Sequence, residues 1–595
     1  MNQVWKKRLT IALICLASFV MYIVLGYVHY ETNDDIGFNS IAGGPLANSE
    51  KLFFINVLYG WILKVFYSIT NGINWYLWIM LLLNVIGLTS LCIVISQDFD
   101  IKKSVLITVI INIAVGGQVY NDLQFTKNAS FLLVVGFVVM ADSIRKTKGI
   151  HISKFIVGLM FFLLGYMIRV ESFTILIPYF ALYILAVVVS RIICDRRNKS
   201  KVSIKRFISC VIVPAVIVLI SMSIVRGVDY YVMHSSEEWK TYWNYHALRS
   251  DLRDRGTPDY ESNKDMYDSI GWDENELNLF RFWITADDAF DYDHLRTIVD
   301  AKGKDESFSF KFDEAFLQSY YDNFYKKTVR EFSYPYVYIV ILLGVLLATN
   351  WAGILYVIGS IMVILIEYGY LVAIARVLWR VEFGMWLAML VLLALFLMKN
   401  YSKESVFAKL VEKCKRGIEK RQEAEKEEKK PDIAGIFSKL IWILAILLFV
   451  ERGILLVGDF IEIKGGHFTE VTENPAADFI DYTRNDGKIY YIDNLTFDNK
   501  FRSVFDIRGD LSIFGEKYVG LGGWMVPSPV WYDNYNGDVP QIKDLYLKDN
   551  VYFVDCNNTN GYILGLLQKR YDPNIEVELV DFFEGIGVWH FYISE

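Results

Sequence analysis

Long apolar runs separated by polar segments dominate the first 400 residues. A membrane-spanning helix needs about 20 mainly apolar residues. Runs close to that length lie at 9–28, 75–95, 104–120, 128–142, 154–168, 172–192, 207–226, 335–349, 351–374, 378–398 and 436–456. The pattern therefore predicts a polytopic α-helical membrane protein with about 11 transmembrane helices.

The first apolar run begins as a signal peptide does, directly after Lys6, Lys7 and Arg8. A signal peptide ends in small residues, and Tyr27 and His29 stand there instead. We therefore expect an uncleaved first transmembrane helix.

The basic loops predict the orientation, because Lys and Arg are retained on the cytoplasmic side. They gather at 6–8, 102–103, 145–148, 191–206 and 399–430. Alternation puts these segments on one side only if the apolar run 52–69 does not cross, and its Asn56 and Lys64 fit an interfacial helix. The alternative is a spanning helix beside a re-entrant segment. The first interpretation places the N-terminus in the cytoplasm and the C-terminus outside.

The segments predicted to face outward are the loop 29–74 with its interfacial helix, the loop 227–334 and the tail. In the tail, β-like runs at 488–493 and 551–555, a helical run at 562–571 and two strands over 576–594 predict a small α/β domain. The predicted division is a transmembrane module (1–400), a charged cytoplasmic linker (401–435), a last transmembrane helix (436–456) and an extracytoplasmic α/β domain (457–595).

Composition supports the membrane prediction and excludes several other classes. The 595 residues are 54% hydrophobic with a mean hydropathy of +0.30, which is too apolar for a soluble globule. A net charge of -7 argues against a nucleic-acid partner. The six cysteines form no CxxC pair, so structural zinc and a disulfide framework are disfavoured. Cys556 alone lies in a predicted outer segment, which fits a bacterial plasma-membrane protein.

The acidic pair Asp34 and Asp35 follows immediately after the predicted outer end of the first helix. Two adjacent carboxylates at a membrane surface raise each other's pKa, which suits one of them to act as a general base. The alternative is that both are solvated loop residues.

Three more groups of polar residues lie at predicted outer helix ends. They are Gln124 with Lys127, Arg169 with Glu171, and Arg376 with Arg380. Ionisable residues at such positions are costly and usually face a cavity or a partner. Acids on the first loop with arginines on later helices provide a base and a phosphate-binding group. The alternative is that the arginines pair locally or extend to the lipid headgroups.

This arrangement resembles the GT-C superfamily of integral membrane glycosyltransferases. The resemblance covers most of residues 1–400 and rests on the acidic first outer loop, its interfacial helix, the large outer loop and the outer C-terminal domain. It implies that Asp34 or Asp35 matches the position of the catalytic acidic residue and that Arg376 and Arg380 hold a lipid phosphate. The pair is not the Asp-x-Asp form of several members, so no cofactor or metal site is assigned, although two carboxylates offer ligands for Mg²⁺ or Mn²⁺.

The reaction that the resemblance implies is sugar transfer from a polyprenyl-phosphate donor to a cell-surface glycan, lipid or protein. Asp34 or Asp35 would accept the proton of the acceptor hydroxyl, and Arg376, Arg380 or Arg169 would stabilise the leaving phosphate. Trp239, Trp243 and Trp272 in the loop 227–334 are candidates for stacking on sugar rings, with burial in a core as the alternative. Two other functions stay open: a flippase for a lipid-linked saccharide and a non-catalytic protein of cell-envelope polysaccharide assembly.

Overall fold

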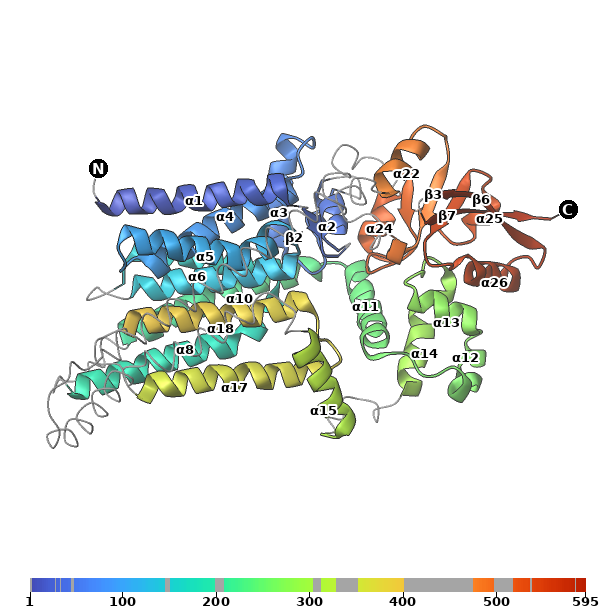
Figure 1. The fold of residues 1–595 in the computed structure, drawn as a ribbon. Coiled ribbons are helices and arrows are strands. Elements are labelled where there is room, and N and C mark those ends of the chain that lie inside the picture. The colour runs from blue at the N-terminus through green and yellow to red at the C-terminus, as the bar shows by residue number, and fades with distance from the viewer. Residues whose placement is uncertain are drawn as a thin grey trace, which may run out of the picture.

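The computed structural model describes residues 3–26, 28–32, 34–43, 48–144, 150–197, 208–302, 312–327, 351–400, 475–496, 517–535, 538–583 and 585–594. The predicted spans 335–349 and 436–456 and the predicted linker 401–435 lie outside these residues. A bundle of long helices is joined at one end to a mixed α/β unit (Figure 1).

Within the described residues, eight helices are long and apolar enough to cross a membrane. Seven are α1 Gln3–Leu25, α4 Trp75–Ser96, α5 Ile101–Tyr120, α6 Phe125–Ser143, α8 Val170–Arg197, α17 Trp351–Ala373 and α18 Trp379–Asn400. The eighth is α10 Val213–Met233, which continues the π-turn Ile208–Ile212. The apolar α7, Ile152–Ile168, is shorter, with 17 residues. The prediction of a multi-pass helical membrane protein is confirmed, and the count of about 11 stays a prediction.

Contacts between helix ends distinguish two sides of the bundle. At one side the Lys7 ammonium donates to the carbonyl of Gln97 at 2.8 Å, and Lys154 pairs with Asp142 at 2.8 Å. At the other side the Asn121 side chain donates to the carbonyl of Tyr22 at 3.0 Å. The α/β unit lies at this second side, which we call the domain side (Figure 1).

Short elements cover the domain side of the bundle. They are β1 His29–Tyr30, α2 Asp34–Gly43, α3 Val57–Ile69 and β2 Asp122–Leu123. At 13 residues, or about 20 Å, α3 is shorter than a bilayer core. The Asn56 amide before α3 donates to the carbonyl of Met167, and Tyr67 near its end bonds Asn39 of α2. Both ends of α3 therefore contact elements of the domain side.

The C-terminal residues form a five-stranded sheet with the order β4-β3-β5-β7-β6. Strands β4 Tyr518–Gly520, β3 Ile489–Ile492 and β5 Val551–Asp555 are parallel, and β7 Ile586–Ile593 and β6 Ile575–Phe583 close the sheet as an antiparallel hairpin. The helices here are α22 Pro475–Thr483, α24 Pro529–Asn534, α25 Asp544–Leu547 and α26 Asn560–Arg570. Strands β3, β5, β6 and β7 and helix α26 lie where the sequence predicts them.

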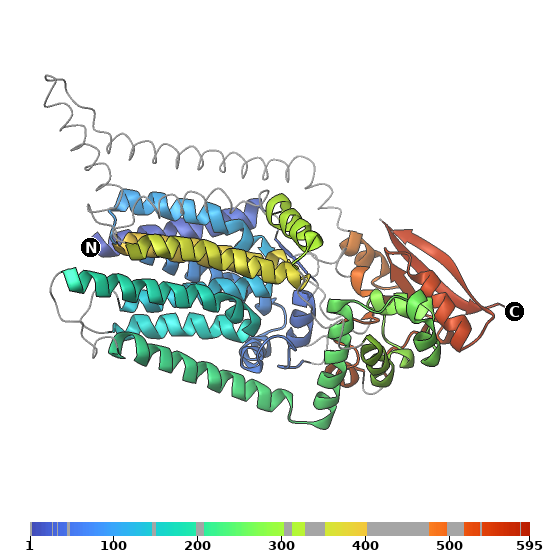
Figure 2. The ribbon, with the colours of Figure 1, turned by 90° about the horizontal axis from the view of Figure 1, so that it is seen from below.

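A second segment leaves the bundle at the end of α10 and is back at it at Tyr320, whose ring packs on Tyr368 of α17. It contains α11 Glu237–Arg255, α12 Lys264–Ser269, α13 Glu274–Arg281, α14 Tyr292–Lys302, α15 Glu314–Tyr321, the 3-10 turns Glu261–Asn263 and Asp288–Phe290 and the π-turn Asp322–Lys327. In Figure 2 the green α10 runs along the bundle, and α11 turns from its end toward the α/β unit.

The helices of this second segment and the C-terminal sheet share one hydrophobic core. Leu248, Leu277 and Phe280 of the helices are buried in the same cluster as Phe553 and Leu566 of the tail. A fully buried carboxylate, Glu276 of α13, also bonds Lys569 of α26 at 2.9 Å. The sequence treats 227–334 and 457–595 as separate segments, whereas helices of 237–302 and the described residues of the tail share one core and form a single unit.

Candidate functional site

The two-stranded ladder of β1 and β2 joins the first domain-side loop to the start of α6. The two strands are parallel, with His29 opposite Asp122 and Tyr30 opposite Leu123. The Glu31 amide extends the ladder by donating to the carbonyl of Leu123 at 2.8 Å. The acidic pair that follows in α2 is thereby placed beside the first turn of α6.

The predicted ligand-binding pair Gln124 and Lys127 lies in this first turn and is almost fully buried. Gln124 caps α6, because its side-chain oxygen accepts from the amides of Thr126 at 2.5 Å and Lys127 at 3.2 Å. The Lys127 ammonium contacts Glu31 at 3.0 Å and Asp122 at 2.5 Å.

Gln118 also accepts a hydrogen bond from the Lys127 ammonium, at 3.2 Å. The ammonium therefore has two hydrogen-bond acceptors, Gln118 and Asp122, and an ion-pair contact with Glu31. Burial acts to raise the pKa of Asp122, but the hydrogen bond and charge of His29 and the charge of Lys127 outweigh it and lower the pKa to about 2. This network favours a positioning role for Lys127 in place of the predicted substrate contact.

Asp35 points into the protein interior. It is fully buried, and its Oδ1 accepts from the Tyr76 hydroxyl at 2.6 Å and from the Phe125 amide at 3.1 Å. Its Oδ2 is buried with no partner among the described residues. Burial raises the pKa of Asp35 well above its usual range, and the charge of Asp34 adds to the shift. We therefore infer that Asp35 is protonated and that the charge of the pair resides on Asp34.

Asp34 begins α2, and its carboxylate meets a residue from the far end of the sequence. The indole Nε1 of Trp524 donates to Asp34 Oδ1 at 2.8 Å. One helical turn after Asp34, a Cβ on Gly37 would lie 3.0 Å from the indole ring of Trp524. The absence of a side chain at Gly37 lets the indole lie across α2.

The Trp524 ring packs among three phenylalanines of the domain side. Ring centroids lie 5.1 Å away for Phe38, 4.7 Å for Phe53 and 5.5 Å for Phe54. Edge and tilted contacts of this kind each add about 0.5–1.5 kcal/mol beyond area burial. The indole is therefore held between α2 and the loop that leads into α3.

The loop that carries Trp524 is bound by Arg249 of α11, whose side chain is fully buried. The guanidinium donates to the carbonyls of Gly523 at 2.8 Å, Val526 at 2.5 Å and Trp524 at 2.9 Å. The Tyr242 hydroxyl donates to the Trp524 carbonyl as well, at 2.6 Å. The second segment thus determines where the loop presents Trp524.

Arg169 contributes a positive charge beside Asp34. Its guanidinium lies 5.2 Å from the Phe54 ring and 5.3 Å from the Phe125 ring, and its Nε bonds Glu171 at 2.9 Å. Burial lowers the pKa of Arg169. The negative charges of Glu171 and Asp34 act to raise this pKa, and the positive charges of Arg380 and Arg376 lower it further.

The two later arginines differ in their partners. Arg376 forms an ion pair with Asp254 of α11 at 2.8 Å. Among the described residues, Arg380 at the start of α18 makes no hydrogen bond or ion pair. The charges of Asp34, Arg380 and Arg376 all act on Arg169, and Arg376 also connects the bundle to α11.

The two carboxylates of the acidic pair have separate protein partners, Trp524 for Asp34 and Tyr76 for Asp35. Within the described ranges, no three His, Cys, Asp or Glu side chains are grouped closely enough to hold a metal ion.

Sequence reasoning did not identify Trp524. Of the three tryptophans considered for sugar stacking, Trp239 and Trp272 are buried in the hydrophobic cores, with 4% and 1% exposure, which is the alternative expected for them. A weak signal for Trp524 exists in the two glycines that precede it, because Gly523 has a φ of 80° and marks a sharp turn.

Comparison of this chain with protein-family models, with curated proteins and with solved structures gives no match. What the protein does has to be inferred from the residues described above.

Proposed function

We propose that this chain is a GT-C-type membrane glycosyltransferase, which transfers a sugar from a polyprenyl-phosphate donor to a cell-surface acceptor. The observation that carries the proposal is the Asp34 carboxylate at the domain side of the bundle, bonded to Trp524 and within the field of Arg169. A base, a cation and an apolar helical bundle in one place are what a lipid-linked sugar donor requires.

In this proposal the domain side is the outer face of a bacterial plasma membrane and the N-terminus is cytoplasmic. The Lys7 and Lys154 contacts lie at the opposite end of the bundle, where the basic loops are expected. The polyprenyl chain of the donor would remain among membrane lipids, and its sugar would reach the folded unit.

The proposed step forms one bond and breaks another. The acceptor oxygen attacks the anomeric carbon while Asp34 takes its proton, and the bond from that carbon to the phosphate oxygen breaks with inversion. The bonding electrons leave on the lipid phosphate. General-base help of this kind accelerates a reaction by about 10² to 10⁴.

Asp34 is the proposed base because Asp35 is enclosed. Asp35 is fully buried and inferred to be protonated, so it neither reaches an acceptor nor takes its proton. Asp35 is assigned the role of a positioning residue that joins α2 to Tyr76 of α4 and to Phe125 of α6.

Arg169 and Arg380 are proposed to stabilise the leaving phosphate. No general acid is proposed to protonate the leaving phosphate. Guanidinium groups beside it would stabilise the negative charge that develops as the bond breaks. Arg380 is the better placed of the two later arginines, because Arg376 is occupied by Asp254.

The test is turnover of radiolabelled polyprenyl-phosphate sugars by the purified chain in lipid nanodiscs. We expect Asp34→Asn to lower release of lipid phosphate by about 10² to 10⁴ while the melting midpoint stays unchanged. Asp300→Asn, at an exposed ion pair on α14, is the matched control and should leave turnover unchanged.

If Asp34→Asn turns over as fast as the wild type, Asp34 is not the general base. If no donor reacts and Asp34→Asn still complements a deletion strain, the chain is a flippase or a non-catalytic assembly protein. Transport of a fluorescent lipid-linked saccharide across proteoliposomes then separates these two.

A further inference from the structure

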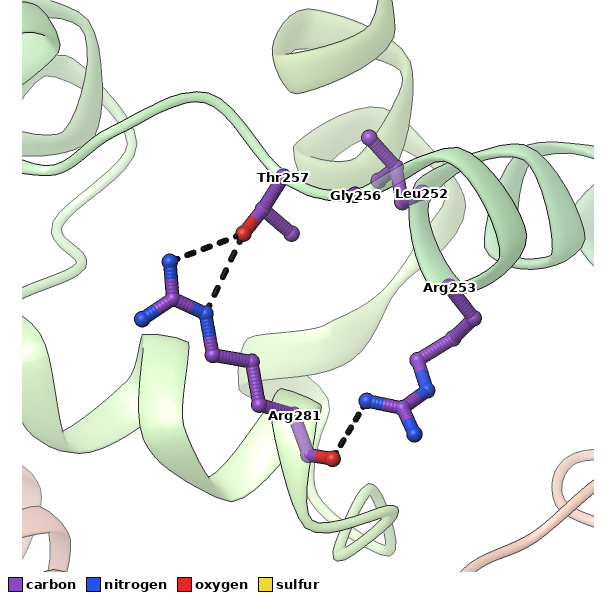
Figure 3. A pocket seen from close by; sticks show the side chains of 5 residues that line it. All are labelled: Leu252, Arg253, Gly256, Thr257 and Arg281. Atoms are coloured by element: carbon purple, nitrogen blue, oxygen red, sulfur yellow. Dashed lines mark hydrogen bonds between the residues drawn. The ribbon is translucent and has the colours of Figure 1, made fainter. Parts of the chain in front are cut away.

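A cavity of about 220 Å³ lies in the folded unit, away from Asp34. It is lined by Leu252, Arg253, Gly256, Thr257 and Arg281 (Figure 3). The first four residues belong to the end of α11 and the turn after it, and Arg281 is the last residue of α13. Its volume is several times the roughly 30 Å³ of a water molecule.

Two guanidinium groups line this cavity without a carboxylate in contact. Arg281 donates through Nε and Nη2 to the Thr257 hydroxyl oxygen at 3.2 and 3.0 Å, and Arg253 donates to the backbone carbonyl of Arg281 (Figure 3). The Nε of Arg253 is buried and has no hydrogen-bond partner in the described part of the chain. Neither arginine forms an ion pair there.

The nearby carboxylates are bound to other groups. Asp254 pairs with Arg376 at 2.8 Å, Asp251 pairs with Arg255 at 2.9 Å, and Asp259 accepts from the Ser262 amide and hydroxyl. Burial lowers the pKa of Arg253 to about 10; the charge of Asp254 acts against this shift, and the charge of Arg281 adds to it. Carboxylates therefore lie near the cavity, but none of the described ones forms an ion pair with Arg253 or Arg281.

We propose that this cavity binds a phosphate group through Arg253 and Arg281. Two guanidinium groups that form no ion pair with a described carboxylate suit an anion of nearly two negative charges better than a singly charged carboxylate. The N–H groups of Arg253 and Arg281 that are not already used in hydrogen bonds are donors of the kind that phosphate oxygens accept. The proposal does not depend on the glycosyltransferase reaction, because binding is measured without turnover.

Occupancy of the cavity would act on the loop that carries Trp524. The Arg253 guanidinium lies 4.5 Å from the Trp283 ring, and Arg249, one turn earlier in α11, lies 5.7 Å from the same ring. The carbonyl of Trp283 accepts from the Gly523 amide at 3.1 Å. A phosphate at Arg253 would therefore restrain Trp283 and, through it, the residue next to Trp524.

The experiment measures the melting midpoint and direct binding of the full-length protein in nanodiscs. The probes are inorganic phosphate in neutral phosphatidylcholine discs, sodium chloride at equal ionic strength, and discs that contain phosphatidylglycerol. We expect saturable stabilisation by phosphate and none by chloride. Arg281→Gln and Arg253→Gln should each weaken binding roughly tenfold or more. Arg296→Gln, at an exposed ion pair on α14, should bind as the wild type does.

The lipid composition of the nanodiscs distinguishes the two sources of a phosphate group, a soluble ligand and a lipid headgroup. Binding of free phosphate indicates a soluble ligand, and stabilisation only by phosphatidylglycerol that is lost in Arg281→Gln indicates a lipid headgroup. Stabilisation that is equal in the wild type and in both arginine variants would overturn the proposal, as would the absence of any saturable effect. If Arg281→Gln does not fold, Arg281→Lys takes its place in the comparison. Lysine keeps the positive charge but lacks the forked N–H donors of the guanidinium.

Discussion

Trp524 and Asp34 are 490 positions apart in the sequence, and the indole Nε1 of Trp524 donates to Asp34 Oδ1 at 2.8 Å. The contact joins the C-terminal sheet region to the first helix of the domain side. A donor at this oxygen fixes the orientation of the Asp34 carboxylate at the start of α2.

The first prediction concerns this bond. Trp524→Phe keeps an aromatic ring among Phe38, Phe53 and Phe54 but removes the N–H donor. Hydrogen bonds to charged groups contribute about 1.5–3 kcal/mol, so we expect turnover to fall by roughly 10- to 100-fold and the melting midpoint to fall as well.

The matched control for Trp524→Phe is Trp589→Phe. The Trp589 indole also donates to a carboxylate, Asp555 at 3.0 Å, within the C-terminal sheet. If both variants lose activity equally, the loss reflects general damage to the α/β unit, and the contact with Asp34 has no special role.

The second prediction is a pH dependence of stability from Asp35. Its pKa is raised by burial in the folded protein, while an unfolded carboxyl loses its proton near pH 4. Above that pH the folded state holds the extra proton, so Asp35 lowers stability by up to about 1.4 kcal/mol per pH unit until its own raised pKa is passed.

Asp35→Asn should remove this decline, because the amide keeps an oxygen for Tyr76 and Phe125 and does not titrate. Melting midpoints measured in detergent from pH 5 to 9 provide the comparison. Parallel curves for the wild type and Asp35→Asn would show that Asp35 is ionised in the folded protein.

The third prediction tests the buried network of Lys127. Replacing the ammonium with an apolar side chain, as in Lys127→Met, leaves Glu31 and Asp122 as neighbouring negative charges. Breaking a buried ion pair costs about 3–5 kcal/mol, so we expect a clearly lower melting midpoint. Lys102→Met, at an exposed position of α5, should melt as the wild type does. If Lys127→Met loses turnover but no stability, the result would favour the original prediction that Lys127 contacts the substrate.

The fourth prediction concerns the turn before Trp524. A Cβ on Gly522 would lie 1.5 Å from the carbonyl oxygen of Trp283, which no real contact allows. Gly522→Ala should therefore displace the loop and lower both stability and turnover. At Gly561 in α26 nothing lies within 4 Å of the added Cβ, and Gly561→Ala should be neutral or stabilising by up to about 1 kcal/mol. Equal stability of the two variants would contradict the close approach at Gly522.

The membrane helices were predictable because their apolar runs are long and continuous. The strands β3 and β5 were predictable because their apolar runs are short and bounded by polar residues. Asp34 and Asp35 stand out in the sequence as charges at the end of an apolar helix. These features are local, so the chain itself displays them.

Other features of the site depend on tertiary contacts that no local pattern records. Strands β1 and β2 have two residues each, too few for a period-2 pattern. The pairing of Arg376 with Asp254 and the approach of Trp524 to Asp34 join distant segments. The sequence shows that Trp524 follows a glycine turn, but not which surface that turn meets.

The shared core of 237–302 and 475–594 imposes an order on the synthesis of the protein. The chain between these two segments contains the membrane-spanning candidates α17 and α18, so the first segment is synthesised before the part of the tail that covers Leu277, Phe280 and Leu248. At about 5–20 residues per second, the tail follows on the order of ten seconds later. In the orientation proposed above, the first segment would cross the membrane with these apolar side chains uncovered, and a ribosome that stops before residue 475 would leave only half of the core.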